Sequence, residues 1–224
     1  MAVWPFRKLT SIASLTEPLP RTEIVRRGRI AVLDDETPEM LQDLRGHGLS
    51  IDHLTSTDAA QFHNLVDAFY DLLLLDYGGI GPRFGNDEGL DVLRYLKRVN
   101  PSLRILAFTA RTFDASKADF FRICDGVVKK DAGIRETLEQ IELHLSEVLT
   151  PAYQFSALAQ AIGVTSEQRQ QLESALSKAL VGGIDREKAI AAAKRIAKGS
   201  GEKLVETIVT KAIELGAISL ASHG

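Results

Sequence analysis

This chain has few of the residues that cross-link small proteins or bind zinc in them. It contains one cysteine, Cys124, and five histidines among 224 residues. A single cysteine excludes an internal disulfide, and one thiol with scattered histidines does not supply a structural zinc site. We therefore expect the protein to work in a reducing cytoplasm.

Long apolar runs are also missing. Pro5, Arg7 and Lys8 interrupt the N-terminal residues before a stretch of signal-peptide length can form. No later run is long enough to span a bilayer. We therefore expect neither secretion nor insertion into a membrane.

The charge is nearly balanced, with a net charge of −3, but it is unevenly distributed. Residues 1–29 contain six lysines and arginines against two glutamates, together with three prolines. This composition is typical of a solvated segment with little regular structure. We expect residues 1–27 to form a partly disordered basic arm, and this is favoured over a segment that binds nucleic acid.

From Arg29 to about Leu149, short apolar runs alternate with helical patterns. Strands are predicted at residues 30–33, 50–54, 72–75, 105–108 and 126–128, and helices at 38–46, 59–69, 89–99, 113–123 and 134–149. Continuous apolar strands separated by helices are typical of a parallel sheet covered on both faces. The sequence therefore predicts a doubly wound α/β domain with a five-stranded parallel sheet over residues 28–149.

Polar residues of complementary chemistry follow four of these predicted strands. Asp34 and Asp35 follow the first strand and Asp76 the third, while Thr109 follows the fourth and Lys129 the fifth. The carboxyl ends of parallel strands share one edge of a sheet, which is where such sheets bind ligands. Carboxylates suit a divalent cation such as Mg²⁺, and a hydroxyl and an ammonium group suit a phosphoryl group.

The residue types allow specific roles in phosphoryl transfer. An aspartate can act as nucleophile and form an aspartyl phosphate, and we assign this role to Asp76. Asp34 and Asp35 would hold Mg²⁺, which also relieves the repulsion among three neighbouring carboxylates. Lys129 would pair with Asp76 and then with a phosphate oxygen, and Thr109 would hydrogen-bond the phosphate.

In the order of these residues, the chain resembles the receiver domain of two-component response regulators. The resemblance covers residues 28–149 and implies that a histidine kinase or phosphotransfer protein phosphorylates Asp76. It also implies that the backbone carbonyl of Gly78 is a further Mg²⁺ ligand. A protein of this kind signals and is not an enzyme with a separate substrate, since it catalyses only its own phosphorylation and dephosphorylation.

Three positions depart from the receiver pattern. The segment from Asp76 to Gly89 is several residues longer than usual, which predicts a flexible surface insertion over the site. Lys130 stands where proline usually follows the lysine, so Lys130 is an alternative for the role assigned to Lys129. Gly126 stands where many receivers have the aromatic residue of the phosphorylation switch, which could mute that switch.

Beyond Pro151 the sequence becomes alanine-rich and shows no strand pattern. Helices are predicted at residues 153–162, from a Thr165–Gln168 capping box to Gly182, at 186–198 and at 202–215. Residues 151–224 are thus predicted to form a small bundle of three or four helices. Because such a bundle is near the lower size limit for an independent core, we expect an interaction or dimerisation module, with a homodimer as one form.

Two alternatives to this interpretation remain. Residues 186–198 and 202–215 could form a DNA-binding helix-turn-helix. Glu202 at the start of the second helix, and nine basic against seven acidic residues in 151–224, argue against it. In the other alternative, the protein is a receiver-like scaffold that never carries phosphate.

Overall fold

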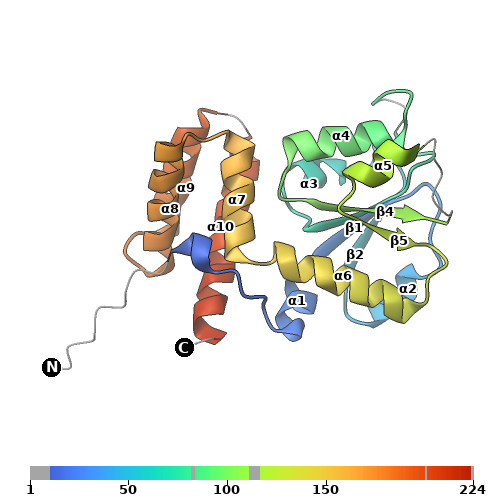
Figure 1. The fold of residues 1–224 in the computed structure, drawn as a ribbon, viewed down its shortest axis with the longest axis horizontal. Coiled ribbons are helices and arrows are strands. Elements are labelled where there is room, and N and C mark those ends of the chain that lie inside the picture. Colours follow the sequence, from blue (N-terminus) through green and yellow to red (C-terminus); the bar gives the residue numbers. More distant parts are fainter. Residues whose placement is uncertain (1–10, 82–83, 111–116, 200, 223–224) are drawn as a thin grey trace. The chain divides into compact units, whose positions relative to one another are not determined.

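The computed structural model describes residues 11–81, 84–110, 117–199 and 201–222, drawn in Figure 1. These residues form two compact units. One contains residues 18–149, and the other contains residues 150–224 together with the segment that precedes Pro18. None of the described helices is both long enough and apolar enough to cross a lipid bilayer.

The first unit is built on a five-stranded sheet in which every pair of neighbouring strands is parallel. Its strands are β1 (Arg29–Leu33), β2 (Ser50–Leu54), β3 (Leu72–Leu75), β4 (Arg104–Thr109) and β5 (Gly126–Lys129). Their order in the sheet is β2-β1-β3-β4-β5, which is that of flavodoxin-like doubly wound folds. The predicted α/β fold is therefore confirmed.

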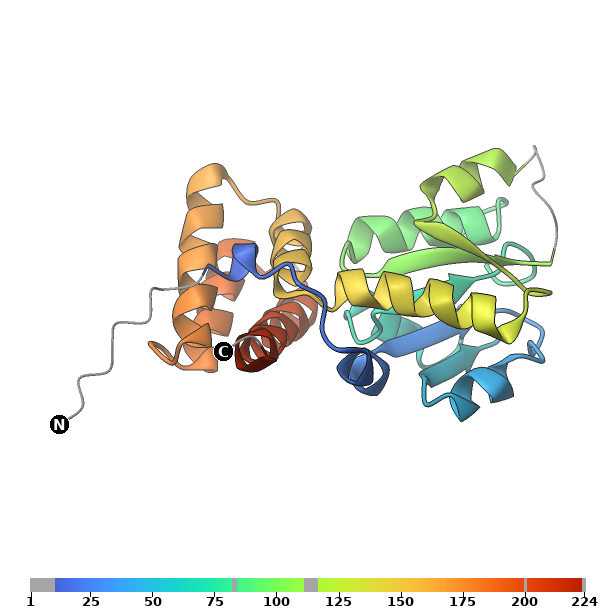
Figure 2. The ribbon, with the colours of Figure 1, turned by 60° about the horizontal axis from the view of Figure 1, so that its bottom comes forward.

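Helices cover both faces of this sheet. They are α1 (Arg21–Arg27), α2 (Leu41–Gly46), α3 (Phe62–Val66), α4 (Gly89–Val99), α5 (Ala118–Ile123) and α6 (Ile134–Val148). Figures 1 and 2 show α3, α4 and α5 on one face, and α2 and α6 on the other, with α1 beside α6. Residues 113–116 of the helix predicted at 113–123 lie outside the described residues.

Complete burial of the central strands explains their continuous apolar sequence. All four leucines of β3 are fully buried, as are the last four residues of β1. Helix α4 buries Leu90, Leu93 and Leu96, which lie on one helical face. Because β1 and β3 are adjacent and parallel, with Leu33 paired with Leu75, the residues that follow them leave the sheet at the same edge.

The second unit contains α7 (Pro151–Ile162), α8 (Ser166–Leu180), α9 (Arg186–Ala197) and α10 (Glu202–Ser222). The predicted capping box is present, since the Thr165 hydroxyl accepts from the Gln168 N–H while the Gln168 side chain accepts from the Thr165 N–H. Helix α10 contacts the other three helices. It continues past the predicted end at residue 215 to Ser222, and at Gly216 it lies so close to α8 that a Cβ atom would be 2.8 Å from the Leu180 side chain.

The N-terminal segment differs from the expected basic arm. Within the described residues 11–27, a 3₁₀ helix, η1 (Ile12–Ser14), is followed by α1. The basic residues of α1 are paired: Arg26 and Arg27 contact Glu23, and Arg21 contacts Glu142 of α6. Composition alone did not reveal these pairs, and residues 1–10 of the expected arm lie outside the described residues.

The η1 segment is part of the helical unit. The Ile12 side chain is fully buried, and its N–H donates to the Ser177 hydroxyl of α8 at 3.0 Å. The Ser11 hydroxyl contacts the Glu173 carboxylate, and the Ala152 N–H of α7 donates to the Leu15 carbonyl at 3.2 Å. A stretch of chain preceding the α/β unit thus completes a core formed by residues that follow it.

Replacing Ile12 by alanine should therefore destabilise the helical unit. Loss of a buried isoleucine side chain should lower its free energy of unfolding by about 3 kcal/mol. Hydrogen exchange of the α7 and α8 amides would measure the change, with Thr16→Ala at a neighbouring exposed position as the control. Equal exchange rates in the two variants would show that η1 is not part of this core.

Candidate functional site

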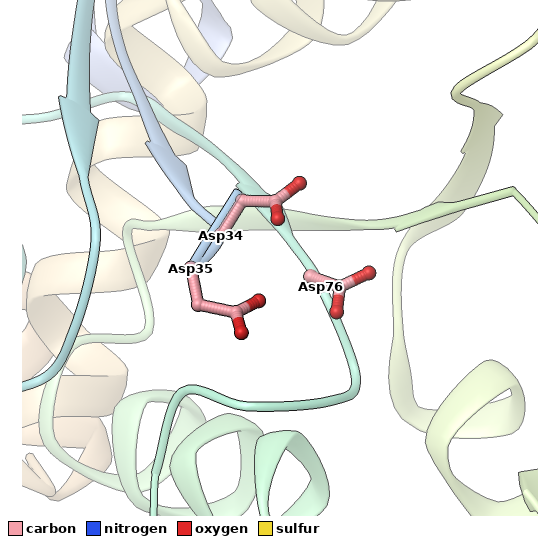
Figure 3. A group of neighbouring side chains, drawn as sticks. All are labelled: Asp34, Asp35 and Asp76. Carbon is pink, nitrogen blue, oxygen red and sulfur yellow. The ribbon is translucent and has the colours of Figure 1, made fainter. Parts of the chain in front are cut away.

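Three carboxylates meet at the carboxyl edge of the sheet. Asp34 and Asp35 follow β1, Asp76 follows β3, and one oxygen from each lies within 4.8 Å of the others. Figure 3 shows the three side chains gathered where the two strands end. Among the described residues, this is the group of acidic, thiol or imidazole side chains that could hold a metal ion. The predicted convergence of these aspartates is therefore observed.

The backbone places these aspartates by continuing the sheet hydrogen bonds. The Asp76 N–H donates to the Leu33 carbonyl at 2.9 Å, and the Asp34 N–H donates to the Leu54 carbonyl at 3.0 Å. The His53 imidazole Nε2 lies 2.8 Å from the Asp34 carbonyl oxygen, which fixes the main chain there. The strand ends, not the loops beyond them, thus determine where the carboxylates lie.

The three carboxylates differ in exposure and in local hydrogen bonding. Asp34 is buried, Asp76 is half-buried and Asp35 is exposed. Asp34 Oδ1 accepts from the Glu36 N–H at 3.1 Å, and Asp76 Oδ2 accepts from the Gly78 N–H at 2.8 Å. Both carboxylates therefore have one oxygen held by the backbone and a second oxygen directed to other partners.

The second oxygens of Asp34 and Asp76 share one cation, the ammonium group of Lys130. Lys130 Nζ lies 2.7 Å from Asp34 Oδ2 and 3.0 Å from Asp76 Oδ1. Burial alone would lower the pKa of Lys130, but its hydrogen bonds and charge attraction to Asp34 and Asp76 outweigh burial and raise it. The ammonium group therefore keeps its charge at neutral pH.

Lys130, not Lys129, thus pairs with Asp76, so the expected pairing of Lys129 with Asp76 is corrected in favour of the alternative, Lys130. Side chains alternate along a strand, and Val128 is buried while Lys129 is exposed. The Lys130 N–H donates to the Thr109 carbonyl at 2.9 Å, so this alternation continues for one residue past β5. The Lys130 side chain consequently turns toward the carboxylates.

Thr109 and Gly78 lie at the same edge of the sheet. Thr109 is the last residue of β4, is half-buried, and pairs with Lys129 across the sheet. Gly78 follows Asp76 closely and is held by the hydrogen bond from its N–H to that carboxylate. Their expected roles stay predictions: the Thr109 hydroxyl as a hydrogen-bond donor to the phosphate, and the Gly78 carbonyl as a ligand of Mg²⁺.

Sequence reasoning missed two residues that shape the site, Gly79 and Glu88. Gly79 has φ of +73°, and a Cβ atom there would lie 2.2 Å from Asp35 Oδ2, so only glycine fits. The Gly79 N–H donates to Glu88 Oε2 at 3.1 Å. The glycine pair after Asp76 was a usable signal for a close approach, whereas nothing in the sequence linked Glu88 to Gly79.

The long segment after Asp76 is packed, which corrects the expectation of a flexible surface insertion. Ile80 and Gly81 are buried, and the Ile80 carbonyl accepts from the Thr57 N–H at 3.3 Å. The Phe84 ring lies 5.5 Å from Phe62 of α3 and 5.0 Å from Tyr95 of α4, between ring centroids. The apolar side chains of Ile80 and Phe84 therefore hold the described part of this loop against the rest of the unit.

The His144 side chain of α6 lies against Gly126 of β5. A Cβ atom on Gly126 would lie 2.8 Å from the His144 imidazole Nε2 and 3.2 Å from the Leu106 side chain. An aromatic side chain therefore has no room at this position. Phe108 of β4 is fully buried in the core.

No protein-family model and no curated protein matches the chain. Similar solved structures include one described as a two-component system response regulator/GGDEF domain protein, with 16% identity and a TM-score of 0.46, matching 57% of this chain and 53% of that chain. A second is a CheY-like receiver domain from Methanospirillum hungatei, with 20% identity and a TM-score of 0.44, matching 54% of this chain and 95% of that chain. A third is a response regulator from Thermotoga maritima in complex with Mg²⁺ and BeF, with 25% identity and a TM-score of 0.43, matching 52% of this chain and 98% of that chain.

The chain thus spans about half the length of the first of these structures. The descriptions of all three structures name response regulators, the proteins whose receiver domain the strand-end residues of this chain resemble.

Replacing Lys130 by methionine should destabilise the α/β unit, because the buried Asp34 carboxylate loses its partner cation. We expect a loss of about 3 kcal/mol without metal, and recovery of part of it when Mg²⁺ is added. Lys129→Met, the matched control at an exposed position, should change stability by less than about 0.5 kcal/mol. Hydrogen exchange of the β1 and β3 amides would measure both, and equal effects would contradict the assignment to Lys130.

Proposed function

We propose that this protein is a response regulator of a phosphorelay that accepts a phosphoryl group on Asp76 in the presence of Mg²⁺. The observation that carries the proposal is the convergence of three carboxylates within 4.8 Å with the ammonium group of Lys130 bridging two of them. A nucleophile, a cation site and a fixed positive charge are the parts that phosphoryl transfer needs. They lie where doubly wound sheets bind ligands, at the switch point between β1 and β3.

The donor set fits Mg²⁺. Asp34, Asp35 and Asp76 offer hard carboxylate oxygens, and the Gly78 carbonyl would be a fourth protein ligand. The exposure of Asp35 suits an ion that keeps several of its waters. When bound, Mg²⁺ would neutralise negative charge on the phosphoryl oxygens.

The residues of this chain would carry the transfer as follows. A carboxylate oxygen of Asp76 attacks the phosphorus of a phosphohistidine or a small acyl phosphate, forming a P–O bond as the bond from phosphorus to the donor breaks. Lys130 then pairs with a phosphoryl oxygen, and the Thr109 hydroxyl donates to another. Hydrolysis by water returns free phosphate and the Asp76 carboxylate.

In this proposal residues 28–149 form the receiver domain, and residues 151–224 form an output or dimerisation module in a cytoplasmic protein. A histidine kinase or phosphotransfer protein would be the phosphoryl donor. Ion pairs within the helical unit favour protein contacts over DNA binding: Lys194 of α9 lies 2.7 Å from Glu206 of α10, and Arg186 lies 3.5 Å from Glu214. Carboxylates beside these basic side chains reduce the positive potential that would attract a phosphate backbone.

Incubation with acetyl phosphate and Mg²⁺ should add one acid-labile phosphoryl group to the wild-type protein. Asp76→Asn should remove the adduct because an amide cannot act as the nucleophile. Asp87→Asn, which removes an exposed carboxylate from the same loop, should leave it in place. Intact mass before and after acid treatment would measure the adduct, and chelation of Mg²⁺ should prevent it.

The same experiment separates the proposal from the scaffold alternative. A receiver-like scaffold would show no adduct and weak Mg²⁺ binding. An adduct of equal yield on Asp76→Asn would place the phosphoryl group on another residue and would refute the assignment.

A further inference from the structure

Gly78 and Gly79 lie between Asp76, a carboxylate of the site, and Glu88, a carboxylate outside it. The Gly78 N–H donates to Asp76 Oδ2 at 2.8 Å, and the Gly79 N–H donates to Glu88 Oε2 at 3.1 Å. A Cβ atom placed on Gly78 would lie 3.7 Å from Asp76 Oδ2 and 3.6 Å from Glu88 Oε2. Successive amides of one turn are thus held by two different carboxylates.

The backbone at Glu88 has an unusual conformation. Glu88 has φ of +44° and ψ of −117°, a conformation that costs a non-glycine residue about 1–3 kcal/mol. The next residue, Gly89, donates its N–H to the Tyr77 carbonyl at 2.8 Å. A Cβ atom on Gly89 would lie 2.6 Å from the Asp76 carbonyl oxygen, so the start of α4 is pressed against the chain that follows β3.

The long segment between Tyr77 and Glu88 makes this approach possible. Ile80 is buried near Thr57, and Phe84 packs between α3 and α4. With these anchors in place, Glu88 at the end of the segment lies beside the Gly78–Gly79 turn at its start. The long segment therefore brings the Glu88 carboxylate to the site, where it accepts from the Gly79 N–H.

We propose that Glu88 is a positioning residue of the cation site, which fixes the Gly78–Gly79 turn so that the Gly78 carbonyl can serve the metal. This inference rests on the proposed function, because it concerns the same Mg²⁺. Glu88 acts through the backbone of Gly79 and does not touch the ion. Removing such an outer partner of a metal ligand typically weakens metal binding by about 10–100-fold.

Three variants test the role of Glu88. Glu88→Ala removes the acceptor of the Gly79 N–H and should weaken Mg²⁺ binding by about tenfold or more. Glu88→Gln keeps an oxygen acceptor and should recover most of the affinity. Asp87→Asn removes an equal charge from the adjacent residue, and should bind Mg²⁺ as the wild type does. Calorimetric titration of the full chain with MgCl₂, at a temperature where every variant is folded by circular dichroism, gives the affinities.

The outcomes separate this inference from the function on which it rests. Wild-type affinity in folded Glu88→Ala would overturn the role of Glu88 and leave the phosphoacceptor proposal intact. An equal loss in the Glu88→Gln and Asp87→Asn variants would also overturn it, because net charge alone would then explain the effect. If the wild-type protein binds no Mg²⁺, both the inference and the proposed function fail.

Discussion

Repulsion among three neighbouring carboxylates is the constraint to which the rest of the site responds. Two unit charges at a separation of 4.8 Å repel by about 3 kcal/mol at an effective dielectric constant of 20. Lys130 offsets part of this by pairing with Asp34 and Asp76, which are the two less exposed members. Asp35 faces solvent, so its charge is screened by water. The arrangement concentrates negative charge at the ends of β1 and β3, with the Asp35 carboxylate exposed to solvent.

The sheet fixes this charge cluster because its strands are buried and parallel. β1 and β3 are adjacent and parallel, so both end at the same edge of the sheet. The hydrogen bonds from Asp34 to Leu54 and from Asp76 to Leu33 extend the strand pairing into the site. The main chains of Asp34 and Asp76 cannot move apart without breaking these hydrogen bonds. The cost of holding like charges together is therefore met by the folding of the α/β unit as a whole.

Much of this could be predicted from the sequence, because it depends on strong local patterns. The run Leu72–Leu75 is apolar at every position, which is typical of a central parallel strand, and Asp76 could then lie only at its end. The choice between Lys129 and Lys130 could not be made in the same way. It depends on how far the alternation of β5 continues, and a one-residue difference reverses the direction of the side chain.

The features that escaped prediction all depend on contacts between residues far apart in the sequence. Ile12 is buried by α7 and α8, which follow it by more than a hundred residues, so no local pattern marks it as a core residue. The loop after Asp76 was expected to be flexible because it is several residues longer than usual, yet Ile80 and Phe84 anchor it. Glu88 reaches Gly79 only because this loop ends beside its own start.

The central claim is that Asp76 carries a phosphoryl group as an acyl phosphate. Borohydride reduces an acyl phosphate to an alcohol, so reduction of the phosphorylated protein followed by peptide mass mapping would identify the residue directly. The account predicts homoserine at position 76 in samples treated with acetyl phosphate and Mg²⁺, and aspartate there when Mg²⁺ is chelated. Unmodified aspartate at position 76 in both samples, or homoserine at another position, would contradict it.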